Sequence, residues 1–299
     1  MLAEVLDCLR PRPGAIIVDC TVGFAGHARE LLQQTGPGGK LIGFDLDASN
    51  LEKARERLAE VELPFSLHHG NFAGAARVVG ETAPEGCDCL LADLGMSSMQ
   101  LDDPQRGFSF MRDGPLDMRM DPSRGRTAAD LLATLPEAEL AALIAGLGDE
   151  PQADRIARAI VRQRGQAPLL RTEELRQLIE EAAPVKVNPH PTKGQPKPHQ
   201  QKLAPIARVF QALRILVNRE LGNLEALLRQ LPSLLKRGGR AAIISFHSGE
   251  DRLVKAAFKE GQRAGVYAAA SDEPLRATFE ERVTNPRARS AKLRWAVRG

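Results

Sequence analysis

The sequence has few aromatic residues and no long hydrophobic run. Phe, Trp and Tyr make up 4% of its 299 residues, with one Trp and one Tyr. This scarcity disfavours a surface that stacks a long single strand of nucleic acid base by base. The longest apolar runs, such as AIIV and AAIISF, fall far short of the roughly 20 residues of a membrane-spanning helix. The N-terminus also lacks the basic start and apolar centre of a signal peptide, so we expect a cytoplasmic protein that does not enter the membrane.

Cysteine is scarce as well, and its spacing excludes two common uses. Cys8, Cys20, Cys87 and Cys89 are too few for a disulfide scaffold and form no C-x-x-C pair. Cys87 and Cys89 lie two residues apart in the strand-like run CDCLLAD, so both are expected on one face of a strand as buried, neutral thiols. No group of His, Cys and carboxylates has the spacing of metal ligands, and we expect no metal.

The charge is balanced overall but unevenly distributed. The net charge is +3, from 41 basic and 38 acidic side chains. Residues 282–299 nevertheless contain six basic side chains and no acidic one, and residues 185–202 contain four lysines and two histidines without a carboxylate. One such cluster is usually a solvated face, whereas two on one chain shift the balance towards a nucleic-acid partner.

The first 93 residues alternate between strand-like and helical runs. Short apolar runs lie at 15–19, 40–45, 65–69 and 88–93, with helical runs between them. Strand and helix in turn predict βαβ units and a mainly parallel sheet, which places the chain in the α/β class. Ser49 is predicted to cap the helix after the second strand.

The alternation stops after Asp93, and no further buried-strand run occurs before 240–246. The residues between carry apolar side chains at helical spacing, for example in EAELAALIAGL and TEELRQLIEEAA. A gap of this length is too long for one crossover helix. We therefore predict a sheet domain in two parts, residues 1–102 and 203–299, with a small all-α domain inserted at 103–202.

A glycine turn joins the first strand to the next helix in VDCTVGFAGHARELL. Such a turn offers free N–H groups and the positive end of a helix dipole to an anionic ligand. A dinucleotide site has Gly-x-Gly-x-x-Gly, whereas this chain has Gly23, Ala25 and Ala28 at these positions. A methyl group at the second position hinders the approach of a pyrophosphate, and S-adenosylmethionine has no pyrophosphate. We therefore favour S-adenosylmethionine as the cofactor. The alternative, NAD, would make the protein an oxidoreductase.

Two acids at strand ends fit the same cofactor. The carboxylate of S-adenosylmethionine would accept hydrogen bonds from the N–H groups of Ala25, Gly26 and His27. Asp45, 19 residues after Gly26 at the end of the next strand, would accept hydrogen bonds from the ribose hydroxyls. A carboxylate there excludes the 2′-phosphate of NADP. Asp93 ends the fourth strand at the same carboxyl edge, where open α/β sheets bind their ligands.

A longer motif begins at Asp93. The run DLGMSSMQLDDPQRGFSFMRDGPLDMRMD (93–121) closely resembles the signature of the RsmH (MraW) family, the bacterial 16S rRNA cytosine N4-methyltransferases. Further matches are VFQALRILVNREL (209–221), SFHSGEDR (245–252) and NPRARSAKLR (285–294). Because these matches span nearly the whole chain, chance similarity is not a serious alternative.

The resemblance implies a class I, Rossmann-like S-adenosylmethionine-dependent methyltransferase domain, with the inserted helices recognising the substrate. Such an enzyme would methylate the N4 amine of a cytosine in the decoding region of 16S rRNA, position 1402 in the usual rRNA numbering. The partner would be this rRNA in the small ribosomal subunit or its precursor, and a homodimer stays open. The alternatives are a methyltransferase acting on another nucleic-acid amine and a non-catalytic RNA-binding protein.

The motif match also assigns site residues. The cofactor-binding set is Gly23, Ala25, Gly26, His27, Asp45, Phe72, Asp93 and Gln100. Phe72 would flank the adenine, with an apolar core position as the alternative. Asp93 would act in catalysis by accepting a hydrogen bond from the target amine. His247, which follows the fifth strand, is the second catalytic candidate, with a helix-capping role as the alternative.

Basic residues would supply the grip on RNA. We assign this role to Arg287, Arg289 and Lys292, together with the loop at 185–202. Arg119 in PLDMRMD either grips a phosphate or forms an ion-pair network with the acids beside it.

Several features depart from the family pattern, among them Gly249 in SFHSGEDR, where leucine is usual. Ala25 replaces one of the two glycines that usually precede the histidine, a change that a backbone contact tolerates. Ala204 replaces the histidine of a His-Pro-Ala-Thr-Arg segment, so any role of that side chain is lost unless His199 takes it. The chain also begins inside the family's usual opening segment, which points to a start codon placed too late.

Overall fold

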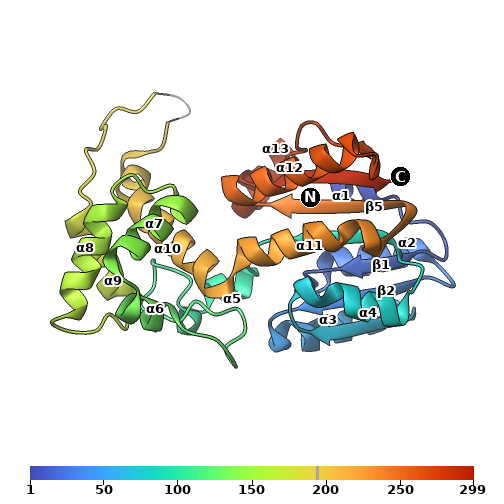
Figure 1. The fold of residues 1–299 in the computed structure, drawn as a ribbon, viewed down its shortest axis with the longest axis horizontal. Coiled ribbons are helices and arrows are strands. Elements are labelled where there is room, and N and C mark those ends of the chain that lie inside the picture. The colour runs from blue at the N-terminus through green and yellow to red at the C-terminus, as the bar shows by residue number, and fades with distance from the viewer. Residues whose placement is uncertain (193–194) are drawn as a thin grey trace. The chain divides into compact units, whose positions relative to one another are not determined.

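The chain folds into two compact units in the computed structural model, which describes residues 1–192 and 195–299 (Figure 1). The first unit consists of Met1–Gly95 and Leu221–Gly299, and the second unit consists of Met96–Glu220. The chain therefore leaves the first unit once and returns to it once, as an insertion requires.

The first unit is built on a mainly parallel sheet. Within the described part of the chain, seven strands are hydrogen-bonded in the order β3-β2-β1-β4-β5-β7-β6. They are β1 (Ile16–Asp19), β2 (Lys40–Asp45), β3 (Phe65–His69), β4 (Cys87–Asp93), β5 (Leu235–Ser245), β6 (Tyr267–Ala270) and β7 (Lys292–Arg298). Of these, β7 runs antiparallel to both of its neighbours. The expected α/β class is confirmed, whereas β6 was not predicted because its sequence, YAAA, has no alternating pattern.

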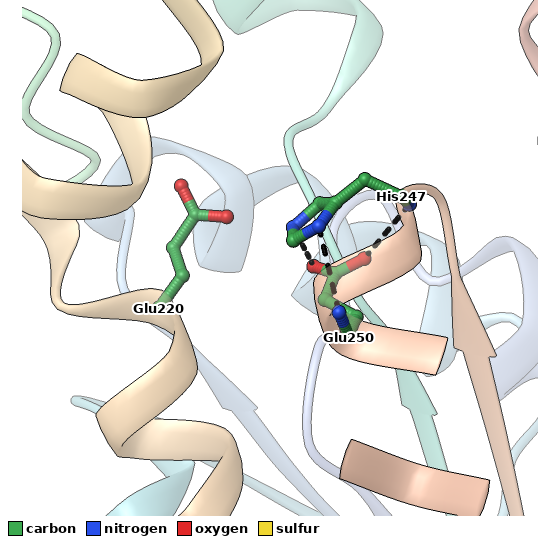
Figure 2. Close-up of side chains that lie close together, drawn as sticks. All are labelled: Glu220, His247 and Glu250. Carbon is green, nitrogen blue, oxygen red and sulfur yellow. Dashed lines mark hydrogen bonds and ion pairs between the residues drawn. The ribbon is translucent and has the colours of Figure 1, made fainter. Parts of the chain in front are cut away.

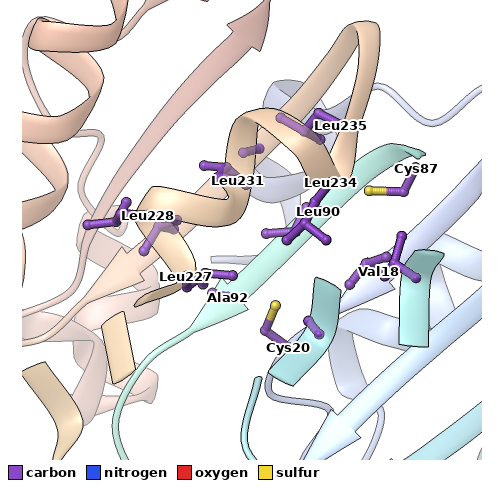
Figure 3. Close-up of a cluster of buried hydrophobic side chains, with 14 of the residues drawn as sticks. Val18, Cys20, Cys87, Leu90, Ala92, Leu227, Leu228, Leu231, Leu234 and Leu235 are labelled. Atoms are coloured by element: carbon purple, nitrogen blue, oxygen red, sulfur yellow. The ribbon is translucent and has the colours of Figure 1, made fainter. Parts of the chain in front are cut away.

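Helices cover both faces of this sheet. The helices on one face are α4 (Ala75–Thr82), α11 (Glu220–Leu234) and α12 (Ser248–Arg263). The helices on the other face are α1 (Leu2–Leu9), α2 (Gly26–Thr35) and α3 (Ala48–Ala59). Figure 3 shows the first of the two apolar clusters, where leucines of α11 lie beside Val18, Leu90 and Ala92. Because the sheet is buried on both sides, its strands read as nearly continuous apolar runs.

The helix after the second strand is capped by Asp47, not by Ser49. The carboxylate oxygen Oδ1 of Asp47 accepts hydrogen bonds from the backbone N–H of Ser49 at 3.1 Å and from its hydroxyl at 2.7 Å. The prediction for Ser49 is therefore wrong, because an aspartate two residues earlier already binds the free N–H groups at the start of α3.

The four cysteines are buried and free, but two of them do not share a face as predicted. Cys87 packs in the cluster of Figure 3, whereas Cys89 packs in the cluster on the opposite face of the sheet. The register between β4 and β5 shifts between them, since Cys87 lies opposite Leu235 and Cys89 lies opposite Arg240. Such a bulge interrupts the alternation of side chains along a strand. Burial raises the pKa of Cys89 to about 12, so its thiol is neutral.

The second unit is helical. Its helices are α5 (Ser98–Asp102), α6 (Ala128–Thr134), α7 (Glu137–Gly148), α8 (Ala153–Arg164), α9 (Thr172–Ala182) and α10 (Pro198–Asn218). The long α10 contacts α6, α7 and α9, and it buries Ile206, Val209 and Phe210. The boundaries proposed from the sequence, after residues 102 and 202, assign most of α10 to the sheet domain. These contacts assign it to the second unit instead.

The chain between residues 198 and 234 forms two consecutive helices, α10 and α11. Arg219 has a left-handed backbone conformation, with φ of 51°, between the end of α10 and the start of α11. Although α10 is 21 residues long, neither it nor any other helix in the described part of the chain has the length and apolar character to cross a membrane.

The motif at 93–121 includes two glycines that packing requires. Gly107 has a φ of 71°, and a Cβ atom there would overlap the carbonyl oxygen of Pro115. A Cβ atom on Gly114 would overlap the carbonyl oxygen of Pro104. These two glycines therefore help to shape a segment of the second unit.

Candidate active site

Three aspartates end neighbouring strands at the carboxyl edge of the sheet. Asp19 is the last residue of β1, Asp45 of β2 and Asp93 of β4. The strand order reverses between β1 and β4, and open α/β sheets bind ligands at such a point. The three carboxyl groups therefore mark the candidate site, and we call them the carboxyl rim.

Asp19 was not among the site residues expected from the sequence. Its side chain is 1% exposed, and Oδ1 accepts the backbone N–H of Thr21 at 2.9 Å. The pKa of Asp19 is raised to about 7. Burial is the main cause, and the negative charges of Asp93 and Asp45 contribute to the same rise. The sequence signal that would have identified this residue is an acid at the last position of the first strand, directly before the glycine turn.

Asp45 fixes the glycine turn and the start of α3. Its Oδ2 atom accepts the N–H of Gly23 at 2.8 Å, while Oδ1 accepts the N–H of Asp47 at 2.8 Å and the amide of Asn50 at 3.1 Å. Burial raises the pKa of Asp45, and these hydrogen bonds oppose the rise. Each carboxylate oxygen can accept more than one hydrogen bond, so Oδ2 retains capacity for a ligand hydroxyl.

Asp93 carries a buried oxygen that has no partner among the described residues. Its backbone N–H donates to the hydroxyl of Thr21 at 2.7 Å, which fixes the end of β4 against the turn. Its Oδ1 atom is buried and accepts no hydrogen bond from any residue that the structure describes, although the side chain as a whole is 30% exposed. Burial raises the pKa of Asp93 to about 7. Buried polar atoms without a partner are uncommon and costly, so this oxygen is a natural acceptor for a donor group of a ligand.

The glycine turn leaves open space at the start of α2. Gly23 and Ala25 have left-handed φ angles of 53° and 60°, so the backbone at Ala25 adopts a glycine-like conformation in spite of its buried methyl group. A Cβ atom on Gly26, the first residue of α2, would meet no atom within 4 Å. The first turn of a helix has N–H groups without intrahelical partners. The space beside Gly26 therefore suits an anionic group.

His27 stands beside Asp93 without forming an ion pair. The distance from His27 Nδ1 to Asp93 Oδ2 is 3.6 Å, which is too long for a hydrogen bond. Burial lowers the pKa of His27 to about 4, so the ring is neutral at pH 7. The expected contribution of His27 through its backbone N–H stays a prediction.

Phe72 and Gln100 have local roles in the fold. Phe72 begins the 3₁₀ helix η1 (Phe72–Gly74) and packs, partly buried, against the apolar cluster of Figure 3. Gln100 belongs to the second unit, where it forms a reciprocal cap with Ser97 at the start of α5. These positions agree with the apolar alternative for Phe72, and a role of either residue in cofactor binding stays a prediction.

His247 caps α12 (Figure 2). Its Nδ1 atom accepts the N–H of Glu250 at 3.4 Å, and its Nε2 atom lies 3.3 Å from Oε1 of Glu250. The other oxygen of Glu250 accepts the N–H of Phe246 at 2.8 Å. His247 therefore has the helix-capping role that the sequence left open as the alternative to catalysis. The geometry gives no support to a catalytic role.

Two of the cations expected to contact RNA are used inside the fold. Arg119 forms a two-pronged ion pair with Asp117, with N–O distances of 2.8 and 2.7 Å, in agreement with the ion-pair alternative. The Nζ atom of Lys292 lies 2.8 Å from Asp251 of α12, which also binds Arg294 at 2.7 Å. Lys292 therefore joins β7 to α12, and the structure does not support its assignment to RNA.

The other two cations lie on an exposed surface with an unexpected apolar component. Arg287 and Arg289 are exposed on η3 (Pro286–Arg289). The preceding helix, α13 (Phe279–Thr284), exposes 73% of Phe279 and 60% of Val283. Phe279 and Val283 lie four residues apart, one helical turn, and close to the arginines in the sequence. This spacing could have identified the apolar surface from the sequence alone. Of the basic loop at 185–202, residues 193 and 194 lie outside the described residues.

A protein-family model described as the MraW methylase family matches residues 1–298. The chain belongs to the MraW methylase family. A relative from Syntrophotalea carbinolica, named "Ribosomal RNA small subunit methyltransferase H", is 46% identical over 98% of this chain and 95% of its own length. A relative of the same name from Geobacter sulfurreducens is 47% identical over 99% and 96%. The fibrillarin of Aeropyrum pernix, crystallised with natively bound S-adenosyl-L-methionine, aligns over 99% of this chain and 74% of its own at 11% identity with a TM-score of 0.43, a likeness too low to bear on function.

As a MraW methylase, the protein is an S-adenosylmethionine-dependent methyltransferase. The carboxyl rim fits this cofactor, because S-adenosylmethionine carries positive charge on its sulfur atom and on its amino group. A dinucleotide would instead bring a negatively charged pyrophosphate towards the same three carboxyl groups, which would repel it. The charge of the site therefore agrees with the methyl donor and disfavours NAD.

Proposed function

We propose that this MraW methylase transfers a methyl group to the N4 amine of a decoding-region cytosine in 16S rRNA. Support comes from the names of the relatives, which are small-subunit rRNA methyltransferases over the full length of the chain. The motif at 93–121 supports the same substrate through its resemblance to the family signature. The reaction would take place in the cytoplasm, on the small subunit or its precursor.

The single observation that carries the proposal is the carboxyl rim beside the open start of α2. When bound, S-adenosylmethionine supplies an electrophilic methyl group on a positively charged sulfur. The N–H groups around Gly26 would hold its carboxylate, and Asp45 would accept hydrogen bonds from its ribose hydroxyls. Asp19 and Asp93 would then face its positive charges. Placement of the two reactants in line is the main contribution of such a site to the rate.

Asp93 would orient the nucleophile. The lone pair of an exocyclic cytosine amine is delocalised into the ring, which makes it a poor nucleophile. The Oδ1 atom of Asp93 has no partner among the residues that the structure describes. A hydrogen bond from the amine to this atom would hold the nitrogen towards the methyl group and favour a more pyramidal geometry. The ionised carboxylate accepts such a hydrogen bond more strongly than the protonated acid does. Since burial raises the pKa of Asp93 to about 7, activity should rise as the pH increases through that value.

RNA would be held by exposed cations, with the target base turned out of its stack. Arg287 and Arg289 supply positive charge, and Phe279 and Val283 supply an apolar surface beside them. The helical second unit would contribute further contacts to the folded RNA. A charge-reversed Arg287→Glu/Arg289→Glu variant should bind the rRNA more weakly and with a shallower salt dependence.

An amine of another nucleic acid is the second candidate. Enzymes that methylate amines in DNA usually have an Asp- or Asn-Pro-Pro-aromatic motif after the fourth strand, whereas this chain has Asp93, Leu94 and Gly95 there. That sequence favours RNA. A non-catalytic RNA-binding protein is disfavoured because the whole chain matches a methylase family.

The test is methylation of small subunits from a strain that lacks this activity, with labelled S-adenosylmethionine and mapping of the modified base. We expect label on the N4 atom of one decoding-region cytosine. Asp93→Ala should lower the rate at least about a hundredfold, while the control Asp7→Ala, at an exposed position on α1, should leave it unchanged. Label on another base, or on DNA in preference to subunits, would refute the proposed substrate. Sedimentation of the same protein separates a monomer from a homodimer.

A further inference from the structure

The second unit contains a cleft that the proposed reaction does not use. The cleft lies between α8 and α9 and has a volume of about 630 Å³. This volume falls within the range of ligand sites in proteins, about 300–1,000 Å³. All of the residues that line the cleft belong to the second unit, so the cleft is complete within that unit.

Three arginines form one wall of the cleft. Arg155, Arg158 and Arg162 line it from α8 and are exposed. Their spacing places them on one face of the helix, about 4.5 and 6 Å apart along its axis. Arg158 has an exposed partner in Glu137 at 3.6 Å, and such a surface pair contributes little. The wall therefore presents a row of positive charges to whatever enters the cleft.

The opposite wall offers hydrogen-bond acceptors. Gln177 and Glu181 line the cleft from α9. Glu174 lines it as well, but one of its carboxylate oxygens already accepts the N–H groups of Leu170 and Arg171 at 2.8 and 3.0 Å. The side chains of Gln177 and Glu181 thus supply the acceptors of this wall. A ligand that matches the cleft must carry negative charge on one side and hydrogen-bond donors on the other.

We propose that the cleft between α8 and α9 binds a segment of RNA, with phosphates on the arginine wall and ribose hydroxyls on the Gln177 and Glu181 wall. Guanidinium groups bind phosphates through paired hydrogen bonds. The 2′-hydroxyl is the donor that distinguishes RNA from DNA. An acidic peptide would also bring donors, its backbone N–H groups, so the choice of RNA over a peptide follows from the proposed rRNA substrate. The proposal rests on rRNA as the substrate and adds a surface that holds it.

The test compares two triple variants that remove the same charge. Arg155→Gln/Arg158→Gln/Arg162→Gln alters the cleft, and it preserves α8 because arginine and glutamine have similar helix propensities. The matched control is Lys255→Gln/Lys259→Gln/Arg263→Gln, at exposed positions along α12. Binding of a decoding-region fragment of 16S rRNA is measured by fluorescence anisotropy over a range of salt concentrations, with circular dichroism to verify folding. A DNA of the same sequence serves as the second probe.

We expect the cleft variant to bind the RNA fragment roughly tenfold to a hundredfold more weakly at 0.15 M salt, and its salt slope to fall by about 2, as the loss of three phosphate contacts predicts. The control should change affinity less than about threefold. Equal losses in the two variants would overturn the proposal, because they would reflect net charge alone. Displacement of RNA by polyglutamate at lower concentration than by DNA would also overturn it, in favour of an acidic protein partner.

The acceptor wall has a separate test. Gln177→Leu/Glu181→Leu should reduce the preference for RNA over DNA, and an unchanged ratio would refute the assignment of ribose hydroxyls to this wall. Methylation assays distinguish this proposal from the proposed function. If the wild type methylates rRNA and the arginine variant keeps the same KM for RNA, the cleft proposal fails alone. If the wild type methylates no rRNA but the arginine variant loses RNA binding, the proposed reaction fails alone.

Discussion

The carboxyl rim predicts that binding of the methyl donor depends on pH and on the charge of its sulfur atom. Burial raises the pKa values of Asp19 and Asp93 to about 7. A carboxyl group with that pKa is about 90% protonated at pH 6 and about 10% protonated at pH 8. A cation that binds beside it stabilises the ionised form and lowers its pKa. The donor should therefore bind more tightly as the pH rises, with release of protons from the rim.

The magnitude follows from linkage. If one carboxyl group must ionise, the apparent affinity rises about tenfold from pH 6 to pH 8, and if both must ionise the rise approaches about a hundredfold. Asp19 and Asp93 lie close enough to influence each other's pKa, so the protons are released by the pair and not by one assigned residue. His27 does not contribute to the change, because its pKa of about 4 lies below this range.

The assay is isothermal titration calorimetry at pH 6, 7 and 8, in buffers of different ionisation enthalpy that count the protons released. S-adenosylhomocysteine is the matched ligand: it lacks the charge on sulfur but carries the same amino acid group, so the titration of that group cancels in the comparison. We expect a steeper dependence for S-adenosylmethionine, and a flatter one in Asp93→Asn. Equal slopes for the two ligands, or no proton release for either, would refute the placement of the sulfur beside the carboxyl rim.

Three further predictions concern single residues. Gly26→Ala should keep or slightly raise the thermal stability, because the added Cβ meets no atom within 4 Å. Calorimetry should nevertheless show at least tenfold weaker donor binding, on the order of 1.4 kcal/mol, because the methyl group blocks the N–H groups at the start of α2. Full affinity would show that the donor does not bind at this helix start. In the folded state the pKa of Asp19 is about 7, above the ordinary value of about 3.9, so the stabilisation from its bound proton is complete at low pH and is lost as the pH rises through 7. Urea unfolding should therefore find Asp19→Asn more stable than the wild type by up to about 4 kcal/mol at pH 8, and by clearly less at pH 5. A difference independent of pH would contradict this. Gly114→Ala should destabilise the second unit by about 1–3 kcal/mol, because the new Cβ overlaps Pro104. The control is Gly146→Ala in α7, where a Cβ meets no atom within 4 Å, and it should stabilise the unit by about 0.5–1 kcal/mol. If Gly114→Ala is tolerated, the segment adjusts to the added methyl group.

Sequence patterns were most reliable where a residue's neighbours along the chain decide its structure. Apolar runs located β1 to β5, because a strand buried on both faces requires a continuous run of such side chains. The positions of Asp45 and Asp93 followed from the same runs, since parallel strands end at one edge of the sheet. The motif at 93–121 identified the family, which the match over residues 1–298 confirms.

Predictions about individual side chains depended on partners far away in the sequence. Lys292 belongs to a basic cluster in the sequence, but its ion pair with Asp251 depends on the packing of β7 against α12. His247 follows a strand end, as a catalytic residue would. Its ring nevertheless caps α12 by accepting the N–H of Glu250 and lying beside the carboxylate of that residue. Cys87 and Cys89 were assigned to one face because a register shift between two strands leaves no mark in either strand alone.

The sequence by itself determined the alternation of strand and helix, the interruption by a helical insertion and the methylase family, because each of these depends on local spacing or on a long linear motif. The tertiary structure decided which charged groups meet. It brought Asp19, Asp45 and Asp93 to one edge, left an oxygen of Asp93 without a partner in the part of the chain that the structure describes, and opened the cleft between α8 and α9. Burial and electrostatic coupling depend on distances through space, and for residues that are far apart in the chain those distances exist only once the chain has folded.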